Sequence, residues 1–234
     1  MIKLENTITP SVDQWNAIIM GARNPLNSWD RMDSEEYVES TWDENKLTLT
    51  PSLKLGTNDY NLLTRLAKAG SDHGKFMRMI TVFVDITAPL YWWKEFDTYK
   101  VGTVANSCST MHKIHAKEFT LDDFSHEHLM GEDRGISYKS TTMYNFKKML
   151  LQTIKVLNCA RAWYLETKDK KYWWQMIQLL PSSYNQKRTV MLNYEVLKNM
   201  YNARKNHKLD EWHDFCDWIE TLPYSELITG KTLK

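Results

Sequence analysis

The sequence of residues 179–207 is "LLPSSYNQKRTVMLNYEVLKNMYNARKNH", and its pattern changes twice. Pro181 ends a preceding helical pattern, because proline cannot continue a helix. Residues 186–192 are typical of an extended segment. Residues 193–207 then carry apolar side chains at the 3.6-residue spacing of an amphipathic helix. This stretch therefore predicts a helix, a strand and a second helix in direct succession.

One face of the predicted helix over residues 193–207 combines apolar and polar groups. Its members follow one another at spacings of four, three and four, so they share that face. They are Asn193, Leu197, Met200 and Arg204. An arginine on an otherwise apolar face is either paired with a buried carboxylate or in contact with a polar ligand. The sequence leaves both alternatives open.

The second half of the chain is predicted to be mostly helical. From Thr141 to about Leu165, apolar residues recur with the period of one long helix that has one buried stripe. They stand at positions 143, 146, 149, 150, 154, 157 and 160. Two further helices are predicted over residues 170–181 and 209–223.

The first half alternates between the two kinds of element. The expected order is a strand over 1–8, a helix over 11–23, a turn-rich surface segment over 25–55, a helix over 58–70, a strand over 76–87 and a short helix opened by Pro89. Ser11 and Asn58 are the expected N-caps, and Gly70 suits a left-handed helix end. We therefore expect an α+β fold with a small antiparallel-rich sheet and a long helical second half, in a single domain over 1–234.

Composition excludes several classes of protein. There are 30 basic and 29 acidic residues, so the net charge of +1 argues against a protein that grips nucleic acid. Three widely spaced cysteines fit reduced thiols. The N-terminus lacks a signal-peptide pattern, and no apolar run is long enough to span a membrane. We expect a soluble, cytoplasmic protein.

Residues 92–112, "WWKEFDTYKVGTVANSCSTMH", mix features of a core and of a loop. Trp92, Trp93 and Phe96 are candidate anchors for a short helix. Residues 100–110 then supply many small polar side chains. Such a segment either covers an aromatic core as a polar loop or wraps an anion or the edge of a flavin ring.

Other chemistries have weaker signals. The turn at residues 70–78 places Asp72 and His73 either in solvent or against a ligand. The chain lacks HExxH and CxxC patterns, so no metal site is expected. It also lacks both phosphate-loop motifs and the GxSxG elbow. A thiol nucleophile at Cys108 is conceivable, but nothing in the sequence lowers the pKa of that thiol.

Taken together, three segments resemble the flavin-dependent thymidylate synthases, the ThyX family. They are "LLTRLAKAGSDHGKFMRMITVFVDITAPLYWWKEF", "DTYKVGTVANSCSTMH" and the stretch quoted first. The last matches a family pattern of Leu-Pro followed by Asn, Leu, Arg and His. Here these are Leu180, Pro181, Asn193, Leu197, Arg204 and His207. The early "GARNP" matches a family Ala-Arg segment.

The resemblance implies roles for individual residues. Cofactor contacts fall on His73, Asn193, Arg204 and His207. Substrate contacts fall on Lys94, Asn106, Ser109, Thr110 and His112. Arg204 and Lys100 take the catalytic positions. The family builds each site from several subunits, so a homotetramer is implied.

The chain departs from the family at its arginine-rich signature. Asp97 stands where the first arginine of the triplet is expected, and Met111 and His112 replace a terminal Arg-Tyr. Another family arginine corresponds to Ile177. Arginine and lysine hold phosphate by charge-assisted hydrogen bonds. Candidates to replace these charges are Lys113, Lys187 and Arg188.

By resemblance, the activity is a methyl transfer to carbon 5 of the pyrimidine nucleotide dUMP. Methylenetetrahydrofolate supplies the carbon, and FAD transfers hydride from NADPH. No enzyme thiol takes part. One alternative is a catalytically inactive descendant that binds a nucleotide or a protein. Another is an unrelated α+β protein with a helical binding surface.

Overall fold

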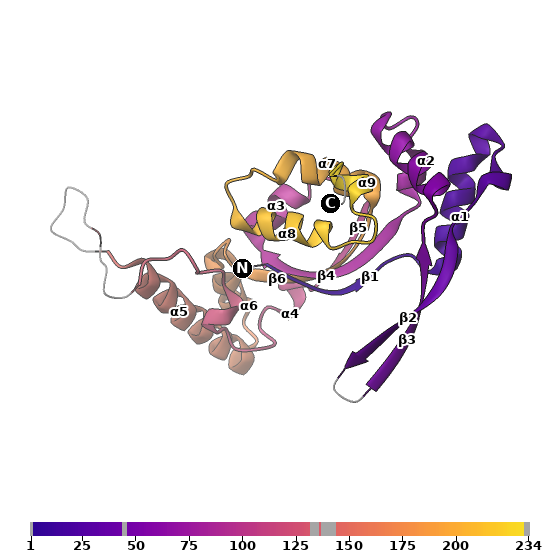
Figure 1. Ribbon diagram of the computed structural model, residues 1–234. Coiled ribbons are helices and arrows are strands. Elements are labelled where there is room, and N and C mark those ends of the chain that lie inside the picture. Colours follow the sequence, from indigo (N-terminus) through magenta and orange to yellow (C-terminus); the bar gives the residue numbers. More distant parts are fainter. Residues whose placement is uncertain (1, 44–45, 132–135, 137–143, 232–234) are drawn as a thin grey trace. The chain divides into compact units, whose positions relative to one another are not determined.

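The computed structural model describes residues 2–43, 46–131, 136 and 144–231 (Figure 1). The strands are β1 (Lys3–Ile8), β2 (Glu35–Asp43), β3 (Lys46–Lys54), β4 (Thr81–Pro89), β5 (Thr103–Ser107) and β6 (Asn185–Asn193). The α-helices are α1 (Val12–Arg23), α2 (Thr57–Lys68), α3 (Leu90–Phe96), α4 (Thr110–Lys113), α5 (Phe146–Thr167), α6 (Lys170–Leu179), α7 (Tyr194–Arg204), α8 (Asp210–Glu220) and α9 (Glu226–Thr229). The expected α+β class, with a small antiparallel sheet and a helical second half, is confirmed.

The chain divides into two compact units. Unit 1 contains Met1–Lys3, Ile86–Thr98 and Asn106–Arg188, and unit 2 contains Leu4–Asp85, Tyr99–Ala105 and Thr189–Lys234. The boundary falls within β1, β4, β5 and β6. The single domain over residues 1–234 stays a prediction.

The larger sheet has the strand order β1-β4-β6-β5. Within unit 2, Asp85 of β4 links three of these strands. Its carboxylate accepts a hydrogen bond of 2.9 Å from Asn6 on β1 and one of 2.5 Å from Thr189 on β6. The Asp85 carboxylate therefore fixes β1 and β6 beside the central strand.

Residues 25–55 differ from the expectation of an irregular surface segment. The short 3-10 turns η1 (Asn24–Leu26) and η2 (Trp29–Arg31) are followed by an antiparallel hairpin of β2 and β3, in which Trp42 lies opposite Leu47. The alternation in "KLTLT" is the strand signal. Pro51 obscures it, but proline is tolerated in a hairpin that has free edges.

Helix α2 begins differently from the prediction. Its N-cap is Gly56, which has no side chain to cap with, and Asn58 is already helical. The cap comes instead from Asp33, whose carboxylate accepts the backbone N–H groups of Asn58 and Asp59 at 2.9 and 3.0 Å. At the other end Gly70 has φ of +103°, as its left-handed assignment requires.

The strand before α3 starts later in the sequence than expected. Residues Lys75–Arg78 form the turn η3, so β4 begins only at Thr81 and continues to Pro89. Pro89 is the N-cap of α3 rather than its first helical residue. Trp92, Trp93 and Phe96 are buried, which confirms them as anchors of that helix.

Residues 100–110 are not a continuous loop. They contain β5 and the first residue of α4. The small residues that lower helix propensity here are compatible with a strand, since Val104 and Thr103 favour extended backbone. The segment also divides between the units, because Tyr99–Ala105 belongs to unit 2 and Asn106 begins the next part of unit 1.

Unit 1 has its own core between α5 and α6, which lie side by side (Figure 1). Predicted stripe positions Leu150, Ile154, Leu157 and Ala160 are buried around Met176 of α6. The prediction is wrong at two outer positions of the stripe, since Phe146 and Met149 are exposed. Residues 141–143, where the helix was expected to start, lie outside the described residues.

Unit 2 is closed by α7, α8 and the short helix α9. Tyr194, at the start of α7, is fully buried, and its hydroxyl donates to the backbone carbonyl of Pro223 at 2.5 Å. Trp15 of α1 packs edge-on against Tyr194 and Tyr224. Leu197 and Met200 are buried on the same helix, as their spacing predicts.

A membrane-spanning helix is not present in the described ranges, since none of their helices is both long and apolar enough.

Candidate functional site

The predicted site residues fall in both units. Unit 1 holds Lys94, Asn106, Ser109, Thr110 and His112, and unit 2 holds His73, Lys100, Asn193, Arg204 and His207. Two separate groups of side chains therefore need to be considered.

Two residues of the first group, Ser109 and Thr110, help to line a pocket of about 310 Å³ in unit 1, called here the α4 pocket. Ser109 and Thr110 line it from the start of α4. Ser109 is the N-cap of that helix, and its hydroxyl accepts the backbone N–H of His112 at 3.0 Å. The remaining lining residues are Thr87, Cys108, Lys113, Ile114, Lys117, Phe119, Asp122, Asp123, Tyr184, Asn185, Gln186 and Lys187.

Strand β6 holds the segment before α4 in place. The backbone N–H of Cys108 donates to the Lys187 carbonyl at 2.9 Å, and the Gln186 amide donates to the Cys108 carbonyl at 2.9 Å. Both bonds use the backbone of Cys108, so its thiol is not needed for them. The position of Ser109 and Thr110 is thus set by hydrogen bonds rather than by a free loop.

The lining of the α4 pocket contains three lysines and two aspartates. Of the three residues considered as substitutes for the family arginines, Lys113 and Lys187 line it. Lys117 lines it too, but its ammonium is paired with Asp123, and this hydrogen bond raises the pKa of Lys117. Lys113 and Lys187 are the other cations of this lining, and Asp122 is its second carboxylate.

Arg188 has a different role. Its guanidinium donates to the Asp97 carboxylate at 2.7 Å and to the Gln186 side chain at 3.0 Å. It also lies 4.0 Å above the ring of Trp93. Arg188 therefore neutralises Asp97, which occupies a signature position, and it does not line the α4 pocket.

One wall of the α4 pocket is apolar and aromatic. It is formed by Ile114, Phe119 and Tyr184, and the rings of Phe119 and Tyr184 lie 6.2 Å apart. Burial raises the pKa of the Tyr184 hydroxyl above its ordinary value, so this group stays a neutral donor at neutral pH. An apolar wall opposite cationic groups suits a planar ring that carries an anionic substituent.

Three predicted substrate contacts do not line the α4 pocket. Lys94 is exposed on α3, Asn106 is exposed on β5, and His112 is exposed on α4 beside Lys113. Their assignment to a substrate stays a prediction.

The second group surrounds Arg204 at the end of α7. The Arg204 Nε–H donates to the Tyr99 hydroxyl at 2.9 Å. Its guanidinium carbon lies 4.8 Å from the ring centre of Trp212 and 5.5 Å from that of Tyr99. His207 packs edge-on against Trp212 as well. The guanidinium is held between two aromatic rings, which fix its orientation.

Asn193 lies at the opposite end of α7. Its side-chain oxygen accepts the backbone N–H of Val196 at 2.9 Å, so it is the helix N-cap. Its own backbone N–H donates to the Gly102 carbonyl at 3.2 Å. The Tyr99–Gly102 turn, which includes Lys100, therefore contacts both ends of α7. Lys100 belongs to this turn, whereas Asn193 and Arg204 remain at opposite ends of the helix.

His73 stands apart from these groups, in the exposed turn between α2 and η3. The His126 Nδ1–H donates to the Phe124 carbonyl at 2.8 Å, and His115 packs against Tyr164. Among the residues that the structure describes, no group of three metal-binding side chains is found.

Several side chains at these places were not predicted. Trp212 and Tyr99 hold Arg204, and Phe119, Tyr184 and Lys117 help to form the α4 pocket. These contacts join residues that are far apart in the sequence, so local spacing carries no signal for them. Lys113 and Lys187 had a signal, because each stands near a position where the family expects a cation.

Solved structures with the same fold include ThyX from Helicobacter pylori with FAD and dUMP. It aligns with a TM-score of 0.60 and 13% identity, over 97% of this chain and 95% of that chain. The UMP/dUMP methylase PolB from Streptomyces cacaoi bound with 5-Br UMP aligns with a TM-score of 0.59 and 12% identity, over 98% and 95%. Its complex with 5-Br dUMP gives 0.57 and 15%, over 98% and 94%.

No family model and no curated protein matches the sequence. At these identities the structural likeness shows the fold, and the ThyX-like fold is confirmed.

Proposed function

We propose that this chain, which has the fold of the flavin-dependent thymidylate synthases, is a flavin-dependent enzyme that methylates a pyrimidine deoxynucleotide. The observation that carries the proposal is the α4 pocket, in which Ser109 and Thr110 lie beside Lys113 and Lys187. By resemblance, Ser109 and Thr110 belong to the family's nucleotide loop. The two lysines offer positive charge where the family arginines are missing.

The solved relatives support a nucleotide as the substrate. The H. pylori enzyme was crystallised with FAD and dUMP, and PolB is described as a UMP/dUMP methylase. A nucleotide has a planar base and an anionic phosphate. The aromatic wall and the lysines of the α4 pocket have the matching chemistry.

The residues around Arg204 fit the cofactor FAD. The rings of Tyr99 and Trp212 hold the guanidinium in a fixed orientation, and a flavin edge carries carbonyl oxygens that accept N–H groups. We expect Arg204 and His207 to bind that edge and Asn193, at the other end of α7, to contact another part of FAD, with Lys100 in the turn between them. Bound FAD supplies hydride transfer, with NADPH as reductant and methylenetetrahydrofolate as carbon donor.

The protein's own contribution is binding and orientation. Lys113 and Lys187 neutralise the phosphate, and the Ser109 and Thr110 hydroxyls offer hydrogen bonds to it. His73, Lys94, Asn106 and His112 are proposed as further contacts on the basis of the resemblance alone. A homotetramer is proposed on the same basis.

The alternative function is nucleotide binding by a chain that has lost the methylation reaction. It is favoured by one observation, the ion pair between Asp97 and Arg188. This pair places a neutralised carboxylate at a signature position that carries an arginine in the family. In that case the chain binds a nucleotide without turning it over.

The absorbance spectrum of the purified protein, together with mass spectrometry of the ligand released on denaturation, tests the proposal. We expect visible flavin absorbance and FAD. Oxidation of NADPH that depends on dUMP and methylenetetrahydrofolate supports the enzyme. Bound flavin without such oxidation, across pyrimidine nucleotides, supports the inactive descendant. A colourless protein that binds neither added FAD nor dUMP contradicts both the enzyme and the inactive descendant. A monomer by light scattering contradicts the tetramer.

A further inference from the structure

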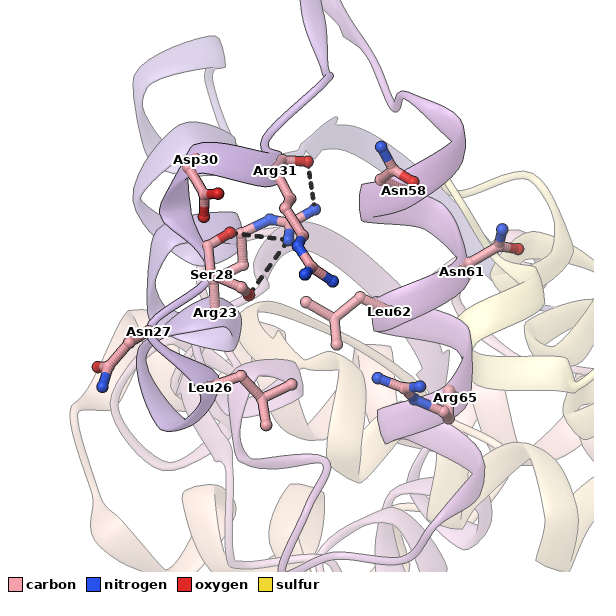
Figure 2. A pocket seen from close by; sticks show the side chains of 10 residues that line it. All are labelled: Arg23, Leu26, Asn27, Ser28, Asp30, Arg31, Asn58, Asn61, Leu62 and Arg65. Carbon is pink, nitrogen blue, oxygen red and sulfur yellow. Dashed lines mark hydrogen bonds between the residues drawn. The ribbon is translucent and has the colours of Figure 1, made fainter.

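A second cavity of about 640 Å³ lies in unit 2, between η1, η2 and helix α2. We call it the α2 pocket. It shares no lining residue with the α4 pocket and none with the group around Arg204. Figure 2 shows its side chains, with Leu62 near the centre and the guanidinium groups of Arg31 and Arg65 directed toward the space around it.

A buried ion pair shapes the α2 pocket. Arg23 and Asp59 are almost completely inaccessible, and the Arg23 Nε–H donates to the Asp59 carboxylate at 2.6 Å. The other Arg23 nitrogens donate to the backbone carbonyls of Ser28 and Arg31, at 3.0 and 2.9 Å (Figure 2). The backbone of the η2 segment is therefore fixed to α2, and the pocket is formed in advance of any ligand.

The second carboxylate oxygen of Asp59 strengthens this framework. It accepts the backbone N–H groups of Asp33 and Ser34, each at 3.0 Å, and the Ser34 hydroxyl at 2.6 Å. Arg23 is fully used in these contacts. The positive charge available to a ligand must then come from other side chains.

Arg31 and Arg65 provide that charge. Both side chains are exposed, and in the part of the chain that the structure describes neither guanidinium has an ion pair or side-chain hydrogen bond. Asp30 is the acidic residue among the lining side chains. Because Asp59 neutralises Arg23, two cations face one carboxylate, and the α2 pocket carries a net positive charge.

The donors are also arranged on one helix face. Asn58, Asn61 and Arg65 are spaced by three and four along α2, so their side chains lie on the same side. The apolar part of the lining is the exposed Leu26 together with the nearly buried Leu62, which lies between the two arginines (Figure 2). Guanidinium and amide donors around an apolar patch suit an anion attached to an organic group.

We propose that the α2 pocket binds a phosphate ester of nucleotide size, with Arg31 and Arg65 holding the phosphate. The planar fork of each guanidinium matches two phosphate oxygens. Asn58 and Asn61 bond to polar atoms of the organic part, Leu26 and Leu62 contact its apolar face, and Asp30 accepts from its hydroxyl groups. This site is additional to the proposed nucleotide and flavin sites, and it does not depend on them.

Titration calorimetry of the full chain with inorganic pyrophosphate at low ionic strength tests the site, since low salt preserves charge interactions. We expect Arg31→Ala and Arg65→Ala each to weaken binding by about tenfold or more. Lys68→Ala is the matched control, because it removes the same charge from an exposed position on α2 outside the pocket. Lys113→Ala controls for binding in the α4 pocket.

The proposal is supported if both arginine variants lose a pyrophosphate site that Lys68→Ala and Lys113→Ala retain; any binding in the α4 pocket is a separate site that only Lys113→Ala weakens. Three results overturn it: no binding by the wild type, an equal loss in Lys68→Ala, or unchanged binding in the arginine variants. Should an alanine variant fail to fold by circular dichroism, Arg31→Lys and Arg65→Lys replace it. These keep the charge but lose the fork, so unchanged affinity in both contradicts the assigned role. The readout needs neither flavin nor turnover, so it can fail independently of the proposed function.

Discussion

Tyr99 and Arg204 are joined by a hydrogen bond of 2.9 Å, from the Arg204 Nε–H to the Tyr99 hydroxyl. They come from a turn and a helix end that are 105 residues apart in the sequence. The ring of Trp212 lies over the same guanidinium. The side chain most central to the proposed flavin site is thus oriented by two residues that contact it from different elements.

Two variants separate the contribution of the Arg204 charge to FAD binding from the contribution of its orientation by Tyr99. We expect Arg204→Ala to lower the affinity for FAD by about 10- to 100-fold, since a charged hydrogen-bond donor is lost. Tyr99→Phe keeps the ring and removes only the bond that orients Arg204, so a loss of about 3- to 10-fold is expected. Flavin fluorescence during titration measures both. Unchanged FAD binding in Arg204→Ala contradicts its role in the cofactor site.

Lys113 is predicted to hold the phosphate of the nucleotide. Lys113→Gln removes the charge at similar side-chain length, and we expect the Kd for dUMP to rise by about tenfold or more. Lys155→Gln, exposed on α5 and outside the α4 pocket, is the control for net charge. Calorimetry with dUMP gives both constants. Equal affinities for the two variants indicate that the phosphate binds elsewhere.

The sequence predicts elements better than it predicts the groups between them. The strand over 186–192 and the helix after it have strong local patterns, and both form, although the helix ends at Arg204 and leaves His207 outside it. The cap of α2 was assigned wrongly because Asp33, which supplies it, lies 25 residues away from Asn58. Local propensity describes only neighbours along the chain, whereas this cap depends on how the chain returns to itself.

The same limit of local patterns explains which residues of the candidate site were predicted and which were missed. Ser109, Lys113 and Lys187 were recognised by comparison with family positions. Tyr184 and Trp212 were not, because an aromatic residue in an amphipathic helix or before a strand is typical of any core. Their proximity to Lys113 and Arg204 arises from packing between distant segments.

The buried pair of Arg23 and Asp59 is predicted to be essential for stability. Asp59→Asn leaves the Arg23 guanidinium buried without a counter-charge, so a loss of about 3–5 kcal/mol in the free energy of unfolding is expected. Urea denaturation followed by circular dichroism measures it. Arg78→Gln breaks the exposed pair with Glu195 and is the control, with a much smaller loss. Equal losses contradict the importance of burial.

Asp59 also predicts how stability changes with pH. Burial alone raises the pKa of this carboxyl, but hydrogen bonds from Ser34, Asp33 and Arg23 outweigh it and hold the pKa below its ordinary value of 3.8. The folded state then binds fewer protons than the unfolded chain at acidic pH. The contribution of Asp59 is complete above that ordinary value and is lost as the pH falls through the lower folded pKa.

Denaturation midpoints measured between neutral pH and pH 3 or below test this direction. We expect the wild type to lose stability in acid more steeply than Asp59→Asn, whose side chain does not titrate. Parallel curves for the two proteins contradict the lowered pKa.

We predict that a larger residue at position 102 destabilises the fold, because its side chain would clash with Asn193. Gly102 has φ of +83°, and a Cβ atom there lies 2.7 Å from the Asn193 side-chain nitrogen. Gly102→Ala therefore combines left-handed strain of about 1–2 kcal/mol with displacement of the α7 cap, worth about 1 kcal/mol more. Gly230 has φ of +69° and open space around it, so Gly230→Ala measures the strain alone.

A double-mutant cycle identifies the cause. If the clash with Asn193 adds to the cost of Gly102→Ala, that cost must fall in an Asn193→Gly background to about the value for Gly230→Ala, because the obstructing side chain is gone. Free energies of unfolding from urea denaturation give the coupling, and non-additivity of about 1 kcal/mol is expected for residues in contact. Strict additivity shows that backbone strain at residue 102 accounts for the whole effect, and that the Asn193 cap is independent of the Tyr99–Gly102 turn.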